Sequence, residues 1–112
     1  FPFKNKKTFF AMTGHIIFNK IDSQNTVTHS KKMIKLIRNK IGFKNIIISD
    51  DLSMKSLKGS ISENTIKTFN SGCNIVLHCN GDLKEMEIVG KNSPLINKFI
   101  LKKTSQFYKI LG

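Results

Sequence analysis

The sequence predicts an α/β fold with a parallel sheet, because three short apolar segments recur with room for one helix between each pair. These segments cover residues 9–13, 45–49 and 74–78. Strands and helices that alternate with this period form βαβ units with right-handed crossovers. Two architectures are built from such units, the doubly wound sheet and the (β/α)8 barrel. Three strands would be well under half of a barrel, which takes about 250 residues.

The first predicted unit joins a strand at residues 9–13 to a helix that begins after Ser30. Serine is a favoured N-cap residue, and Gly42 stands where a helix can end in the left-handed conformation. Between these two positions, apolar side chains recur at helical spacing: Met33, Ile34, Ile37 and Ile41. Residues 16–28 are polar and are expected to form a loop, with His29 as a solvated residue at its end.

The second predicted strand, residues 45–49, contains three consecutive isoleucines and no alternation with polar residues. A continuous apolar run indicates a strand that is buried on both faces, as in a parallel sheet. The helix that follows is expected to begin at Ser60, which starts a capping-box pattern, and to end at Gly72.

The third predicted strand, residues 74–78, is another buried apolar run, and a short helix is expected at residues 83–89. Ser93 and Pro94 have the order of an N-cap and a first helical residue, so a last helix is expected to begin there. Residues 93–112 are expected to form a basic amphipathic helix that is separate from the preceding units.

The net charge of +12 raises the question of a nucleic acid partner. Recognition of phosphates and bases favours arginine, whose planar fork binds two acceptors at once. Arg38 is the only arginine, and the lysines are scattered from Lys4 to Lys109. An AT-rich coding sequence explains this composition more simply, and we do not expect nucleic acid to be the partner.

The sequence favours a cytoplasmic protein without a membrane segment. Its apolar runs are much shorter than the roughly 18 residues of a membrane span. Residues 1–7 lack the apolar core of a signal peptide. Cys73 and Cys79 are two isolated cysteines without the paired spacing of a zinc site, and we expect both to be buried, reduced thiols.

Polar residues gather at the carboxyl ends of all three predicted strands, the edge where α/β sheets place their active sites. The strand ends are Thr-Gly-His at residues 13–15, Ser-Asp-Asp at residues 49–51 and His-Cys-Asn at residues 78–80. The opposite ends contain no acid and no histidine. This asymmetry is typical of a catalytic mouth, although short polar strand caps are also common.

Asp50 and Asp51 are expected to have different roles, because side chains alternate along a strand and adjacent carboxylates disfavour each other's ionisation. One would face the mouth and the other would accept hydrogen bonds from loop amides or helix caps. A purely structural role for both is the alternative. His15 and His78 could meet Asp50 across the mouth, but nothing in the sequence fixes the ligand set of a metal site, and no metal or cofactor is expected.

The segment at residues 46–54, Ile-Ile-Ile-Ser-Asp-Asp-Leu-Ser-Met, resembles a signature of bacterial β-N-acetylhexosaminidases of glycoside hydrolase family three. Flanking segments agree in order and spacing. Residues 11–15, Ala-Met-Thr-Gly-His, resemble the preceding strand, where the family commonly has alanine in place of Gly14. Residues 36–43 resemble the helix and glycine that lead into the signature, and residues 71–81 resemble the last barrel strand.

The resemblance implies a TIM-type barrel, of which residues 1–92 would supply the last three strands. It also implies a retaining β-N-acetylglucosaminidase of cytoplasmic peptidoglycan recycling, with Asp50 as the nucleophile that forms a covalent glycosyl-enzyme. The substrate would be a glycan with terminal N-acetylglucosamine. His15 is a candidate residue for lining the active-site opening at the carboxyl ends of the strands.

The departures from the family concern the general acid. The family's acid/base histidine, its aspartate partner and several sugar contacts precede these strands, and their motifs do not occur in this chain. His15 does not occupy the acid/base position. Loss of a general acid costs about 10²–10⁴-fold in rate. Activity is therefore expected only with the missing N-terminal barrel segment, and the alternatives are an inactive remnant or, less favoured, a basic nucleic-acid-binding module.

Overall fold

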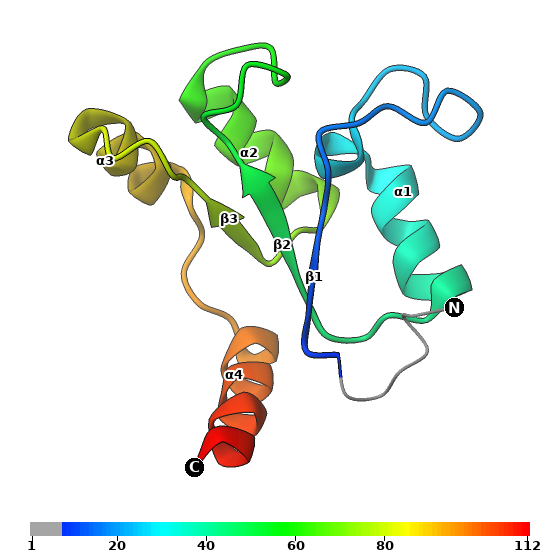
Figure 1. Cartoon of the computed structure of the whole chain (residues 1–112), viewed down its shortest axis with the longest axis vertical. Coiled ribbons are helices and arrows are strands. Elements are labelled where there is room, and N and C mark those ends of the chain that lie inside the picture. The colour runs from blue at the N-terminus through cyan, green and yellow to red at the C-terminus, as the bar shows by residue number, and fades with distance from the viewer. Residues whose placement is uncertain (1–7) are drawn as a thin grey trace.

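The computed structural model describes residues 8–112, in which three parallel strands form one sheet in the order β1-β2-β3 (Figure 1). The strands are β1 (Phe10–Met12), β2 (Ile46–Asp51) and β3 (Ile75–Leu77). Both pairings are parallel, with Phe10 opposite Ile46 and Ile48 opposite Ile75. The predicted parallel sheet is thus confirmed. The predicted barrel segment starts at residue 1, and its first seven residues lie outside the described part.

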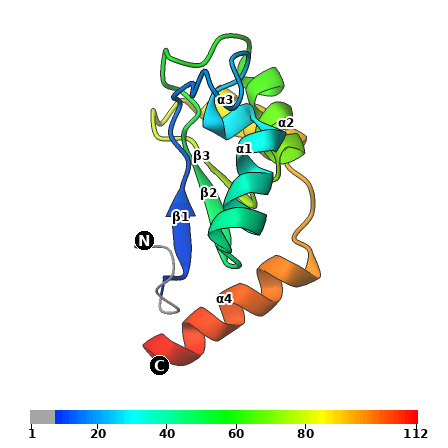
Figure 2. The ribbon, with the colours of Figure 1, turned by 90° about the vertical axis from the view of Figure 1, so that its right-hand side faces the viewer.

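Two helices cover one face of the sheet (Figure 2). They are α1 (Lys31–Leu36), which continues as a π-helix over Ile37–Ile41, and α2 (Ile61–Ser71). Both begin at the predicted serines, since the hydroxyl of Ser30 accepts from the Met33 amide and that of Ser60 from the Glu63 amide. Both end at glycines with positive φ, Gly42 at 79° and Gly72 at 115°.

The core lies between this helical layer and the sheet. Its buried cluster consists of Ile34, Phe43, Ile47 and Cys73, with Ala11 and Ile37 packed against it. The predicted helical stripe and the central strand therefore meet as the sequence pattern requires. Along β1 the two residues that flank Ala11 are more open, with Phe10 36% and Met12 59% exposed. Apolar side chains thus remain accessible on β1.

The C-terminal part differs from the prediction at the end of one helix and at the start of the next. The helix α3 (Leu83–Asn92) extends beyond residue 89, and α4 (Lys98–Leu111) begins after Asn97 instead of Ser93. The Ser93 hydroxyl donates back to the carbonyl of Val89, so Ser93 ends α3. The Asn97 side chain accepts from the amide of Ile100 at 2.9 Å, which is the bond of an N-cap.

The helix α4 lies below the amino ends of the strands (Figure 2). Its Phe107 ring contacts the rings of Phe9 and Phe10, with centroids 5.7 and 5.1 Å apart. These aromatic contacts attach the basic C-terminal helix to the edge strand β1. No helix within residues 8–112 has the length and apolar character needed to cross a membrane.

The predicted loop at residues 16–28 is anchored more firmly than its polarity suggests. It ends in a 3₁₀ turn, Val27–His29, in which Thr28 is fully buried. The prediction of a solvated His29 was wrong, because this residue is half-buried. Burial, with Lys67 nearby, lowers the pKa of His29 below its ordinary value. The helical turn carries the histidine against α2, and the sequence alone did not reveal that contact.

Candidate functional site

The carboxyl ends of β1 and β2 are joined beyond the regular strands. The Thr13 amide donates to the Ile48 carbonyl at 2.9 Å, and the Asp50 amide donates to the Thr13 carbonyl at 3.2 Å. These bonds extend the parallel ladder to Asp50, so β2 runs two residues beyond its predicted end at Ser49. Asp50 therefore belongs to the central strand and is not a loop residue.

A bulge in β2 includes the first of the two aspartates, Asp50. The register against β3 shifts between Ile48 and Asp51, so Asp51 lies opposite Leu77. The fully buried Ser49 hydroxyl accepts the Leu77 amide at 3.1 Å and takes the place of a backbone carbonyl in the ladder. Bulges redirect side chains and are frequent beside active sites. No feature of an isoleucine run followed by serine predicts this shift, and sequence reasoning missed it.

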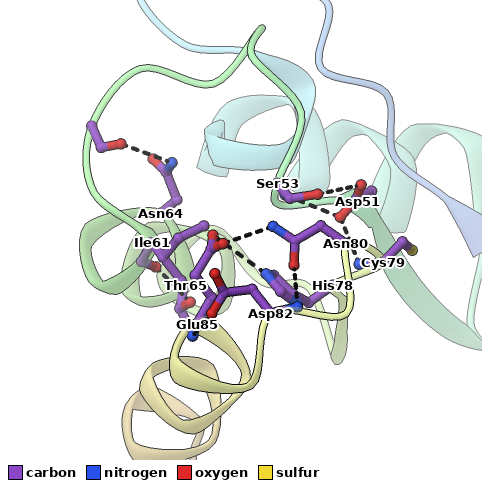
Figure 3. A network of polar contacts seen from close by, with 11 residues as sticks. Asp51, Ser53, Ile61, Asn64, Thr65, His78, Cys79, Asn80, Asp82 and Glu85 are labelled. Carbon is purple, nitrogen blue, oxygen red and sulfur yellow. Dashed lines mark hydrogen bonds and ion pairs between the residues drawn. The ribbon is translucent and has the colours of Figure 1, made fainter.

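The carboxylate of Asp51 accepts hydrogen bonds from the surrounding loops on both of its oxygens (Figure 3). Its Oδ1 accepts from the amides of Ser53 at 3.0 Å and Cys79 at 2.9 Å, and its Oδ2 accepts from the Ser53 hydroxyl at 2.6 Å. Burial opposes ionisation, but the bonds from Ser53 and Cys79 outweigh it and lower the pKa of Asp51. One of the two aspartates was expected to accept hydrogen bonds from loop amides or helix caps, and in the structure Asp51 has the loop amides.

The carboxylate of Asp50 has a different environment. It accepts one hydrogen bond within the described residues, from the amide of Asp51 to its Oδ1 at 2.8 Å. The residue is half-buried at the end of the central strand. An ionised carboxylate offers about four acceptor positions. Asp50 therefore keeps most of its oxygen lone pairs available at a fixed position, as a nucleophile or a ligand-binding carboxylate must.

His15 lies beside this pair and links two segments of the chain. Its Nε2 is 2.8 Å from the carbonyl oxygen of Asp51, and its Nδ1 is 2.8 Å from Oγ1 of Thr28. Both ring nitrogens are thus engaged with the chain itself. That His15 lines the mouth and contacts a sugar stays a prediction.

His78, at the end of β3, belongs to a neighbouring network (Figure 3). Its Nε2 lies 3.5 Å from Oε1 of Glu85, and the side chain is 5% exposed. Asn80 donates to the other Glu85 oxygen at 2.7 Å. Asp82 begins α3 and accepts the Glu85 amide at 3.1 Å. The network connects the end of β3 to the first turn of α3, and Nδ1 of His78 is buried without a partner among residues 8–112.

The histidines and Asp50 do not gather around a common point. Within residues 8–112 no group of three or more His, Cys, Asp or Glu side chains could hold a metal ion. The two cysteines also differ from one another. Cys73 is buried, which raises the pKa of its thiol. Cys79 is exposed, so the prediction of two buried thiols was wrong for this residue. It lies beyond the end of β3, where the chain has left the core.

Comparison with known proteins identifies the family of this arrangement. The family model described as the N-terminal domain of glycosyl hydrolase family 3 matches residues 4–103. A beta-hexosaminidase from Methylobacillus flagellatus is 32% identical over 80 residues, which cover 70% of this chain and 23% of the relative. A beta-hexosaminidase from Nitrosomonas eutropha is 38% identical over 71 residues, which cover 62% of this chain and 20% of the relative.

Solved structures agree with the sequence comparison. Native NagZ from Neisseria gonorrhoeae superimposes with a TM-score of 0.72 at 27% identity, over 88% of this chain and 27% of that one. The beta-N-acetylglucosaminidase from Thermotoga maritima has a TM-score of 0.65 at 32% identity, over 79% of this chain and 21% of that one. The chain spans between a fifth and a third of the length of these relatives.

Proposed function

This chain belongs to glycosyl hydrolase family 3, and we propose that it forms part of the active site of a retaining β-N-acetylglucosaminidase, with Asp50 as the nucleophile. The substrate class would be glycans with terminal N-acetylglucosamine, such as peptidoglycan fragments in the cytoplasm. The observation that carries the proposal is the contrast between two adjacent carboxylates. Within the described part of the chain, the Asp51 carboxylate accepts three hydrogen bonds from loops, whereas the Asp50 carboxylate accepts one from its own neighbour.

The proposed reaction uses these differences. The Asp50 carboxylate attacks the anomeric carbon, the bond from that carbon to the leaving oxygen breaks, and the electron pair goes to the leaving oxygen. Water then attacks the glycosyl-enzyme, which releases the sugar with retained configuration and restores the carboxylate. A group at a strand end is held rigidly, and a small displacement of such a group can cost about 10²-fold in rate.

The proton for the leaving oxygen must come from elsewhere, and we propose that an upstream barrel segment supplies it. The described sheet leaves β1 and β3 each paired on one side only, with β2. An apolar cavity of about 400 Å³ also opens along β1, lined in part by Met12, Phe18, Met33 and Ile41. Unpaired parallel edges and accessible apolar side chains favour a sheet that continues in the complete enzyme.

The proposal is tested with an N-acetylglucosaminide whose leaving group is 2,4-dinitrophenolate, because so weak a base departs without a proton. Hydrolysis of this substrate is measured with the purified chain, alone and with the upstream barrel segment of a family relative added. Asp50→Asn and Glu87→Gln, at an exposed residue of α3, serve as the matched pair. We expect turnover that Asp50→Asn abolishes and Glu87→Gln preserves.

Two outcomes would contradict the proposal. Equal turnover by the chain and by Asp50→Asn would remove Asp50 as the nucleophile. The absence of turnover with the activated substrate, with and without the upstream segment, would favour an inactive remnant of the family.

A further inference from the structure

Three hydrogen bonds connect Thr28, His15, Asp51 and Asp50 in series. Thr28 Oγ1 contacts Nδ1 of His15 at 2.8 Å, Nε2 of His15 contacts the Asp51 carbonyl at 2.8 Å, and the Asp51 amide contacts the Asp50 carboxylate at 2.8 Å. The series begins in the core, because Thr28 is fully buried. It ends at the carboxylate that performs the proposed chemistry. The loop after β1 is thus coupled to the end of β2.

We infer that His15 is a positioning residue, which sets the orientation of Asp51 and, through the Asp51 amide, the orientation of the Asp50 carboxylate. The inference rests on the proposed role of Asp50 and concerns a residue that does not itself react. Its physical basis is the register shift between Ile48 and Asp51, which interrupts the regular ladder against β3 on the segment that carries Ser49 and Asp50. A bulged strand end needs other contacts to define its conformation, and the His15 ring supplies one from the β1 side.

The direction of the bonds identifies the donor. A carbonyl oxygen can only accept, so Nε2 of His15 carries the hydrogen that it shares with Asp51. The hydroxyl of Thr28 can donate to a neutral Nδ1, or it can accept from a protonated Nδ1 while it donates to the Gly14 carbonyl at 3.2 Å. Thr13 Oγ1 lies 2.8 Å from Thr28 Oγ1, and the Thr13 hydroxyl can donate to Thr28 in either arrangement. The Nε2 donor is therefore present in both protonation states of the ring.

This geometry makes glutamine and asparagine an informative pair of substitutions. The amide nitrogen of glutamine reaches nearly the position of Nε2, whereas asparagine reaches only the position of Nδ1. His15→Gln therefore keeps a donor for the Asp51 carbonyl, and His15→Asn leaves that carbonyl without one. Thr28→Val removes the hydroxyl that orients the ring and provides a second, independent perturbation of the same series.

Backbone ¹⁵N relaxation of residues 50–53 tests the inference without any need for activity. We expect order parameters near the rigid value of about 0.85 in the parent and in His15→Gln, and a decrease toward about 0.6 in His15→Asn and Thr28→Val. The order parameters of α2 serve as an internal control for the fold. Unchanged values at residues 50–53 in His15→Asn and Thr28→Val would overturn the inference.

Kinetics with the dinitrophenyl substrate then separate positioning from binding. A positioning role predicts that His15→Asn lowers kcat by about 10–100-fold with little change in KM, and that His15→Gln restores most of the loss. An increase in KM at unchanged kcat would instead make His15 a sugar contact and overturn the inference. If the parent itself shows no turnover, the proposed function of the chain fails, and the order parameters still decide the role of His15.

Discussion

The amide of Cys79 donates to the carboxylate of Asp51 at 2.9 Å, which ties the segment after β3 to the end of β2. His15 reaches the same residue from the segment after β1, at its carbonyl oxygen. Asp51 is therefore the point where the carboxyl ends of all three strands meet. Its neighbour Asp50 takes no part in these cross-strand side-chain bonds. A structural aspartate thus stands directly beside the proposed catalytic one.

The first prediction follows from this division of roles. Asp51→Asn removes a charged acceptor of three hydrogen bonds, so we expect it to lower the free energy of unfolding by about 1.5–3 kcal/mol. Asp50→Asn keeps an Oδ1 acceptor for its single local bond and should change that free energy by less than about 0.5 kcal/mol. Urea denaturation of the two variants measures the difference. Equal destabilisation by both would contradict the assignment of Asp51 to structure.

The second prediction concerns Asp22, which anchors the loop before α1. Hydrogen bonds from the Ser30 hydroxyl and the Gln24 amide, with others from Asn25, lower the pKa of Asp22 from 3.8 to about 2. A carboxyl whose pKa is lower in the folded state than in the unfolded state stabilises the fold at pH values above the unfolded-state pKa. For Asp22 this stabilisation is lost as the pH falls from about 3.8 to about 2.

The pH dependence of unfolding measures this contribution. Between pH 6 and pH 2 the parent should lose more stability than Asp22→Asn, which cannot titrate at this position. Parallel stability curves for the two proteins would show that Asp22 titrates alike in the folded and unfolded chains.

The third prediction concerns Gly14, the position at which the family commonly has alanine. Of the residues that the structure describes, an added Cβ would meet only the Ile16 side chain, at 3.4 Å, and Gly14 does not have a left-handed φ. Gly14→Ala should therefore raise the free energy of unfolding by about 0.4–1 kcal/mol, because the unfolded chain loses conformational freedom. Gly42→Ala, at φ 79°, is the matched contrast and should destabilise by about 1–2 kcal/mol. A stabilising Gly42→Ala or a destabilising Gly14→Ala would contradict the backbone geometry.

The fourth prediction concerns Arg38, which lies in the π-helical continuation of α1 and connects it to the amino ends of β2 and β3. Its guanidinium donates to the carbonyls of Phe43 and Asn45 and to Oδ1 of Asn74. Arg38→Lys loses the fork that makes these bonds together, and we expect a loss of about 1–3 kcal/mol of stability without a specific effect on the strand-end site. Thermal unfolding measures the loss, with the exposed Lys35→Arg as a control. An unaltered melting temperature in Arg38→Lys would contradict this role.

Local patterns were sufficient to predict the order of the elements and the parallel sheet. The capping serines, the terminal glycines and the isoleucine run of β2 each specify their structure within a few residues. Those signals are short-ranged, so they are legible in a single sequence. The same holds for the different environments expected of Asp50 and Asp51, which follow from the alternation of side chains along a strand.

The features that sequence reasoning missed depend on contacts between distant residues. The bulge requires the Ser49 hydroxyl to meet the Leu77 amide, 28 positions further along the chain. The pairing of His15 with Asp51 spans 36 positions. The start of α4 depended on a local competition, in which Asn97 caps the helix and Ser93 bonds back to α3. Serine followed by proline indicates a helix start in general, but a preceding helix can use the serine first.

The most direct test of the central claim is the covalent labelling of Asp50. A fluorinated N-acetylglucosaminide with an activated leaving group forms the glycosyl-enzyme faster than water hydrolyses it, so the intermediate accumulates. The chain is incubated with this reagent, with the upstream segment added, and is then digested and examined by mass spectrometry. We predict one added sugar on the peptide that contains Asp50, and none in Asp50→Asn. A sugar attached to Asp51 or to another carboxylate, with Asp50 unmodified, would contradict the claim.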